Sequence, residues 1–314
     1  MAIIPASNAA ELTAALNAAV PGDRIELALA DYGAFFTAHT FAAPGVTIIS
    51  ADTANQATFT KIDASGSIGL AFEWLKIGPS ASQAIGATDI AFRHCTFQGD
   101  LDATNKGLRQ ALFIKQCVRP KLESSEFFHW RFILKVAGCD DAEVVANNMH
   151  DFDEDAMKMN SNFGLLLQGN WIHDRLAAGS GHGDGMQVSA SNPLRPATDY
   201  IVRGNFFDAG ATKSFQTMFW RNQLAEQSPG DFSLYYKNNL IEDNVIWNGH
   251  SHGISIGESD GITIRNNTLL HAPGLNNAPT IQKPNAATAA SLNKVVTGNI
   301  LEKFNSDPVN NASV

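Results

Sequence analysis

One asparagine position recurs in the second half of the chain, always three residues after an apolar residue and two before another. The six asparagines at this position are Asn147, Asn170, Asn205, Asn244, Asn267 and Asn299. Asparagine tolerates left-handed backbone at a sharp turn, and its amide can both donate to and accept from an identical neighbour. Repetition at one phase therefore predicts stacked rungs in which these side chains form a column.

Earlier copies of the pattern place Cys95 and Ser125 at the asparagine position, and nine copies can be aligned in all. Several steps lie near 22 residues, the length of one rung of a parallel β-helix, and longer steps leave room for insertions. The even spacing of Cys95, Cys117 and Cys139 follows the same repeat. An odd number of cysteines makes a disulfide framework improbable, so we expect a structural role for them.

The N-terminal segment predicts a helix over residues 8–20 that covers the open end of the stack. Asn8 and Glu11 fit a capping box, and Leu12 and Leu16 lie on one face of the helix. Residues 1–304 are then one β-helix unit, followed by a polar tail over residues 305–314.

The chain resembles the pectin-lyase-like superfamily from Ile3 to about Phe304. The resemblance rests on Ala-Glu-Leu-Thr-Ala-Ala-Leu at residues 10–16, on Pro-Gly-Asp-Arg-Ile-Glu-Leu at residues 21–27, and on the asparagine rungs. Members include polysaccharide lyases, epimerases, polygalacturonases and phage tailspikes. It implies an all-β fold, a single right-handed parallel β-helix with an N-terminal capping helix, and a polysaccharide as the ligand; it does not fix the reaction.

A second strand of each rung can be aligned in the same way. Because neighbouring rungs lie about 4.8 Å apart, residues distant in sequence form columns on the surface. One column holds Asp155, Asp184 and His252, another holds Asp153, His182 and His250, and an outward column holds Lys135, Lys158, Gln187 and Ser255. The intervening rung, around residues 215–220, separates the last histidines from the other members.

This patch suits two kinds of chemistry. The candidate catalytic residues are Asp155, Asp184, His182, Lys158, His250 and His252; the candidate substrate-binding residues are Arg131, Lys135, Asp153, Gln187 and Trp220. In hydrolysis one carboxylic acid protonates the leaving oxygen while another carboxylate activates water, and crowding of the two aspartates would raise one pKa. In lyase or epimerase chemistry, His182 or His250 could remove a proton while a lysine, Arg131 or Ca²⁺ neutralises a uronate. No cofactor is required.

Two further interpretations stay open: a non-catalytic glycan-binding face, or solvated turn residues without a ligand. Trp220 and Trp247 lie in or near long insertions, where aromatic faces could stack on sugar rings. Trp171 is expected to pack beside its rung.

Charge and hydropathy narrow the function classes. A net charge of −9 argues against nucleic acid, and no run of eighteen apolar residues could cross a membrane. The N-terminus does not have the pattern of an export signal. These features fit either a carbohydrate-active enzyme on an acidic or capsular glycan, or a spike that forms a homotrimer or attaches to a phage-like particle. The expected location is extracellular or the virion surface.

The segment from Leu101 to Asp140 carries a local excess of positive charge. Its seven basic residues are Lys106, Arg109, Lys115, Arg119, Lys121, Arg131 and Lys135. A positive face on an acidic body can attract an anionic ligand.

Overall fold

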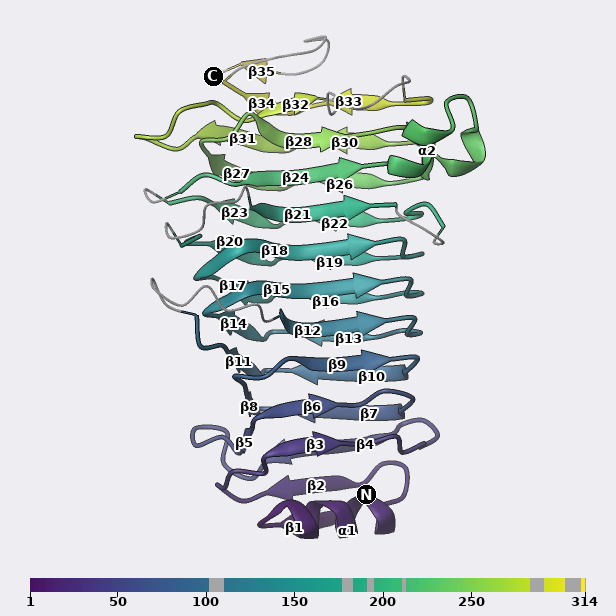
Figure 1. The fold of residues 1–314 in the computed structure, drawn as a ribbon, viewed down its shortest axis with the longest axis vertical. Coiled ribbons are helices and arrows are strands. Elements are labelled where there is room, and N and C mark those ends of the chain that lie inside the picture. Colours follow the sequence, from purple (N-terminus) through teal and green to yellow (C-terminus); the bar gives the residue numbers. More distant parts are fainter. Residues whose placement is uncertain are drawn as a thin grey trace.

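Three long, all-parallel sheets wind around one core in the computed structural model (Figure 1). The structure describes residues 1–101, 110–176, 183–190, 195–210, 213–282 and 291–302, and the backbone of residues 312–313. Each rung contributes a strand to the first, second and third sheet in turn, as β13, β14 and β15 do. The predicted right-handed parallel β-helix is confirmed.

In the described residues the first sheet has twelve strands. They are β1 (Ile3–Ala6), β2 (Arg24–Leu27), β4 (Val46–Ser50), β7 (Ile68–Glu73), β10 (Thr88–Arg93), β13 (Lys121–Glu123), β16 (Glu143–Val145), β19 (Leu166–Gln168), β22 (Ile201–Arg203), β26 (Leu240–Glu242), β30 (Thr263–Arg265) and β33 (Val295–Thr297).

The second sheet has eleven strands in the part of the chain that the structure describes. They are β5 (Thr58–Phe59), β8 (Lys76–Ile77), β11 (Thr96–Gln98), β14 (Glu126–Phe128), β17 (Asn148–Met149), β20 (Trp171–His173), β23 (Phe206–Asp208), β27 (Val245–Asn248), β31 (Thr268–His271), β34 (Ile300–Leu301) and β35 (Ala312–Ser313). The last strand places part of the polar tail on the sheet, beside β34.

The third sheet has ten strands among the residues described. They are β3 (Ala34–Phe36), β6 (Lys61–Asp63), β9 (Ser82–Ile85), β12 (Gln110–Lys115), β15 (Trp130–Ala137), β18 (Phe152–Asn160), β21 (Asp184–Ser189), β24 (Gln216–Arg221), β28 (His252–Ile256) and β32 (Thr280–Gln282). A short pair, β25 (Tyr236–Lys237) and β29 (Ser259–Asp260), and two small helical segments, α2 (Gln223–Gln227) and a 3₁₀ turn (Phe232–Leu234), complete the description.

The six asparagines form a continuous buried ladder at the turn between the first and second sheets. In each step the backbone N–H and the side-chain amide of one asparagine donate to Oδ1 of the next; for Asn147 and Asn170 these bonds are 3.0 and 2.9 Å. Ser125 extends the ladder by donating its N–H to Asn147 Oδ1 at 3.0 Å. The predicted register of the rungs is therefore confirmed.

The left-handed backbone falls one residue earlier than the sequence suggests. The residue before each asparagine has positive φ, as at Ala146 (56°) and Gly204 (61°), while the asparagines themselves do not. The asparagine thus serves by its amide hydrogen bonds, and its neighbour makes the turn.

The three cysteines are free and buried inside the rungs. Cys95 takes the ladder position, with its N–H donating to Ser125 Oγ at 3.1 Å. Cys117 and Cys139 begin a second buried column, in which the Cys139 N–H donates to Asn162 Oδ1 at 2.9 Å. Their placement supports the expected structural role.

Helix α1 (Ala9–Ala18) covers the first rung, as predicted. Asn8 Oδ1 accepts the Glu11 N–H at 3.0 Å, and the Glu11 carboxylate accepts the Ser7 N–H at 2.7 Å. Leu12, Ala15 and Leu16 are buried against the end of the core. No helix among the described residues is long and apolar enough to cross a membrane.

Candidate functional site

Two strands of the third sheet present pairs of polar side chains three residues apart on the outer face. In β18, Ala156 and Met157 are both buried, so Asp155 and Lys158 reach the same side and form an ion pair at 2.9 Å. In β21, Asp184 and Gln187 are joined in the same way, by a bond of 2.8 Å from Gln187 Nε2 to Asp184 Oδ2.

A glycine makes this arrangement possible in β21. A Cβ on Gly185 would lie 2.9 Å from the rings of Phe207 and Phe215, because this position faces the core. Two consecutive inward residues therefore separate Asp184 from Gln187, and the strand departs from strict alternation.

The outer face carries two adjacent columns across the rungs. One consists of Phe132, Asp155, Asp184, Gln216 and His252, and the other of Phe113, Lys135, Lys158, Gln187, Phe219 and Ser255. The structure thus brings Asp155, Asp184 and His252 into one column, with Gln216 in the intervening rung. Ser255 lies in the outward column but is completely buried.

Asp155 and Asp184 form the centre of the site. The Asp184 N–H donates to Asp155 Oδ1 at 2.8 Å, and both side chains are buried. Burial raises the pKa of Asp184 to about 8, and the Asp155 carboxylate adds to this; Gln187, Lys158 and Arg175 oppose it. Asp184 is therefore protonated at neutral pH. Crowding was expected to raise one pKa, but burial is the larger cause.

Arg175 lies beneath the carboxyl pair and was not predicted from the sequence. It is 2% exposed; its Nε donates to the Asp153 carbonyl at 2.8 Å and its Nη1 to the Ser214 carbonyl at 3.1 Å. Burial lowers its pKa, and the surrounding carboxylates, Asp153 first, counter this. The sequence signal is its place two residues after the strand that ends in His173.

Three cations border the carboxyl pair; Arg131, Lys135 and Lys158 are called the cationic shelf below. Lys158 Nζ lies 4.5 Å from the Phe132 ring centre, and Lys135 Nζ lies 5.0 Å from that of Phe113. Arg131 forms an ion pair with Glu154. Within the described residues Lys135 has no carboxylate partner, and burial, Lys158 and Lys115 lower its pKa. The shelf therefore keeps positive charge available to a ligand.

The predicted Asp153 and the three predicted histidines are not part of the Asp155–Asp184 pair. Asp153 is buried, and its Oδ1 has no hydrogen-bond partner among the residues described. His182 lies outside the described residues. His250 and His252 are beyond the Gln216 rung, where their rings meet edge to face at 5.2 Å and His252 lies 5.3 Å from Phe219.

Trp220 cannot contact a sugar, and its prediction as a substrate-binding residue is wrong. It is 0% exposed and packs edge-on against Tyr200 and Tyr236 inside the rungs. The error comes from placing this residue in a surface insertion; it belongs to β24, where alternation turns it inward. Its neighbour Phe219 takes the outward position beside Gln187.

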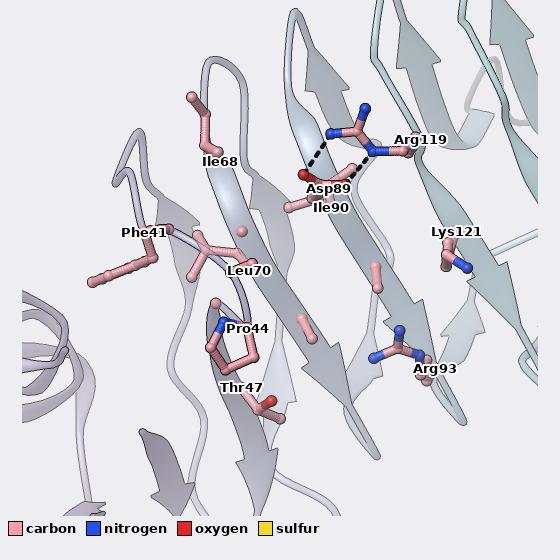
Figure 2. Close-up of a pocket in the computed structure, with 16 residues that line it drawn as sticks. Phe41, Pro44, Thr47, Ile68, Leu70, Asp89, Ile90, Arg93, Arg119 and Lys121 are labelled. Atoms are coloured by element: carbon pink, nitrogen blue, oxygen red, sulfur yellow. Dashed lines mark hydrogen bonds and ion pairs between the residues drawn. The ribbon is translucent and has the colours of Figure 1, made fainter. Parts of the chain in front are cut away.

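Metal ligands do not converge in the part of the chain that the structure describes: no group of three or more His, Cys, Asp or Glu side chains is placed to hold an ion. Ca²⁺ at this face therefore stays a prediction. The 540 Å³ hollow in Figure 2 lies elsewhere, over the outer face of the first sheet.

The sequence matches no protein-family model and no curated protein. Solved structures that share the architecture include a tailspike, a pectate lyase and a glucanase. The Dettilon tailspike protein aligns over 93% of this chain with TM-score 0.58 and 11% identity; the match spans 57% of the tailspike. The chain has the right-handed parallel β-helix fold. Pectate lyase Pel9A aligns over 99% of this chain and 79% of its own, with TM-score 0.53 and 11% identity.

The catalytic unit of a GH87 alpha-1,3-glucanase from Streptomyces thermodiastaticus aligns over 95% of this β-helix and 67% of its own chain. Its TM-score is 0.50 and its identity 12%. At such identities these likenesses establish the fold, and the function must be argued from the residues on the outer face.

Proposed function

We propose that this protein binds an anionic polysaccharide across the outer face of the third sheet and cleaves it by acid–base catalysis. The observation that carries the proposal is the pairing of a protonated Asp184 with Asp155, whose carboxylate is held in an ion pair with Lys158. Most enzymes that hydrolyse a glycosidic bond use one carboxylic acid and one carboxylate at that bond.

In this mechanism Asp184 gives its proton to the glycosidic oxygen as the bond from that oxygen to the sugar carbon breaks. Asp155 takes a proton from the water that adds to the same carbon. Asp184 Oδ1 has no hydrogen-bond partner in the described part of the chain, so it is the oxygen from which the proton can be given. Asp184 has no exposed surface, so the sugar must displace the Gln187 side chain bonded to it.

The cationic shelf defines the substrate class. Lys135 and Lys158 lie over aromatic rings beside the carboxyl pair, and Arg131 adds a third cation. A uronate carboxylate in the neighbouring sugar would be neutralised there, while the rings of Phe113 and Phe132 would contact apolar parts of the sugar. The fold is shared with a pectate lyase, and pectate is an acidic polysaccharide of this class.

The test is cleavage of a panel of acidic polysaccharides, followed by reducing ends and by absorbance of unsaturated uronates. We expect new reducing ends without the absorbance change, and a loss of at least about 100-fold in Asp184→Asn. Absorbance growth would replace hydrolysis with a lyase reaction. No product across the panel would overturn cleavage.

A second candidate is a non-catalytic spike that binds a surface polysaccharide, as a homotrimer or as part of a virion-like assembly. The complete burial of Asp184 favours it, because the shelf can bind a glycan without exposing the acid. The tailspike likeness supports the architecture of such a protein. Under this candidate, the wild-type protein binds an acidic glycan without releasing product, and Asp155→Asn with Asp184→Asn binds it equally well.

A further inference from the structure

The basic segment between Leu101 and Asp140 divides between two faces of the solenoid. Lys115, Arg131 and Lys135 lie on strands of the third sheet, at the site described above. Arg119 and Lys121 instead line a hollow of about 540 Å³ over the first sheet, together with Arg93. These cations therefore serve a different surface.

Small side chains in successive rungs create the hollow. Thr47, Ala71 and Ala91 occupy one outward column of the first sheet, and the next position in that column is the long Lys121. All four line the hollow, so the small residues form its floor.

The segment from Phe41 to Gly45 forms the apolar wall, and Figure 2 shows Phe41 and Pro44 on the side away from the cations. Gly69 lets this segment lie directly against β7: its φ is +67°, and a Cβ there would lie 2.4 Å from the Phe41 carbonyl oxygen. Ile68, 36% exposed, extends the wall. The apolar side thus depends on a glycine that no other residue could replace without displacing the wall.

The opposite side carries cations with unused donors. Arg119 makes two bonds to Asp89, of 2.7 and 2.8 Å, drawn as dashed lines in Figure 2. Arg93 binds Glu123 and Glu73, at 2.6 and 3.0 Å. Among the residues described, Arg119 Nη1 and Arg93 Nη2 donate to no partner, so each guanidinium can still bind an incoming oxygen.

Three cations, Arg93, Arg119 and Lys121, line the hollow with one carboxylate, Asp89. Each cation is ion-paired: Arg119 with Asp89, Arg93 with Glu73 and Glu123, and Lys121 with Glu143 at 2.9 Å. A ligand carboxylate would therefore be held by the remaining guanidinium N–H donors and not by an excess of positive charge. Guanidinium groups match planar oxyanions such as carboxylates. The volume suits a ligand of one or two sugar rings, and the apolar wall suits the C–H face of a ring better than a free inorganic anion.

We propose that this hollow is a second, non-catalytic binding site for a carboxylated sugar of a polysaccharide. The ligand class rests on the proposed function, but the site is built from different residues on a different sheet. Two such sites would let one protein hold a long glycan at two places, which raises the effective concentration of the chain at the catalytic face.

The test is calorimetric titration of the full chain with a galacturonate trisaccharide, and with its methyl ester as the uncharged control. We expect two binding sites for the acid form. Ala71→Phe should fill the floor and remove one site, and Arg119→Gln should weaken that site about tenfold. Thr263→Phe is the matched control, since Thr263 lies further along the same outward column and away from the hollow.

Lys135→Gln with Lys158→Gln should remove only the other site. Unchanged stoichiometry and affinity in both Ala71→Phe and Arg119→Gln would overturn the second site while leaving the proposed function intact. Loss of the hollow's site alone, with no effect of the lysine changes, would support the second site and count against the third-sheet face. Absence of any binding by the trisaccharide would overturn the second site.

Discussion

The asparagine ladder inside the solenoid and the Asp155–Asp184 column outside it share the same rung spacing but have opposite chemistry. In the ladder, identical side chains satisfy one another at every step, as Asn205 does with Asn170 and Asn244. In the outer column the residues differ from rung to rung, and Asp184 Oδ1 and Gln216 Oε1 have no partner within the described part of the chain. Uniform, satisfied columns stabilise the fold; mixed, unsatisfied ones leave groups available to a ligand.

The largest expected effect comes from breaking the ladder. Asn205→Ala removes the Oδ1 atom that accepts hydrogen bonds from the Asn170 N–H and side-chain amide. It also removes the side-chain amide that donates to Asn244 Oδ1 and to the Leu167 carbonyl. Several buried groups then lack partners, so we expect the free energy of unfolding to fall by about 4 kcal/mol. Chemical denaturation measures it.

Asn17→Ala is the control for this prediction, because Asn17 is exposed on α1 and should change the stability by less than about 0.5 kcal/mol. Equal losses in the two variants would contradict the structural role of the ladder.

The next effect, taken per pH unit, is the pH dependence of stability caused by Asp184. Its pKa rises from an ordinary value of 3.8 to about 8 in the folded protein, so the folded state binds the proton more tightly. Stability from this group is full below pH 4 and declines by about 1.4 kcal/mol per pH unit as the pH rises toward 8. Denaturation of wild type and Asp184→Asn across pH 4–9 isolates this contribution; parallel curves would show that Asp184 has an ordinary pKa.

A smaller effect concerns the cationic shelf. Lys135→Gln removes a charge that has no carboxylate partner in the described residues, so an anionic oligosaccharide should bind about tenfold more weakly at low salt. Lys61→Gln is a matched control, because Lys61 Nζ also lies over a phenylalanine ring, 4.5 Å from Phe36, at the far N-terminal end of the same sheet. The same loss in both variants would indicate nonspecific charge attraction.

The smallest effect should follow from Gln216→Met in the outer column. The Gln216 oxygen is buried without a partner among the described residues, so an apolar side chain of similar shape should change the stability by less than about 0.5 kcal/mol. A loss approaching that of Asn205→Ala would remove the distinction between the two columns.

The repeat predicts the fold well because each asparagine position fixes one rung against the next, and the register then places Asp155 above Asp184. It does not predict the burial of these carboxyls or the approach of Arg175, which depend on the conformations of insertions between rungs. Trp220 was misplaced because its assignment depends on single-residue alternation at the end of an insertion. The sequence places the left-handed backbone at the asparagines, whereas the structure has it at the residue before each of them. The repeat does not distinguish these two positions, because either residue is compatible with a turn.

The most direct measurement is a carbon NMR titration of the Asp184 carboxyl, assigned by its absence in Asp184→Asn. The protonated carboxyl beside Asp155 predicts a titration near pH 8 and a lower value in Asp155→Asn, which removes the neighbouring charge while leaving the burial unchanged. A wild-type titration near pH 4 would show that Asp184 is ionised at neutral pH. That result would contradict the proposed cleavage, which needs Asp184 as the acid.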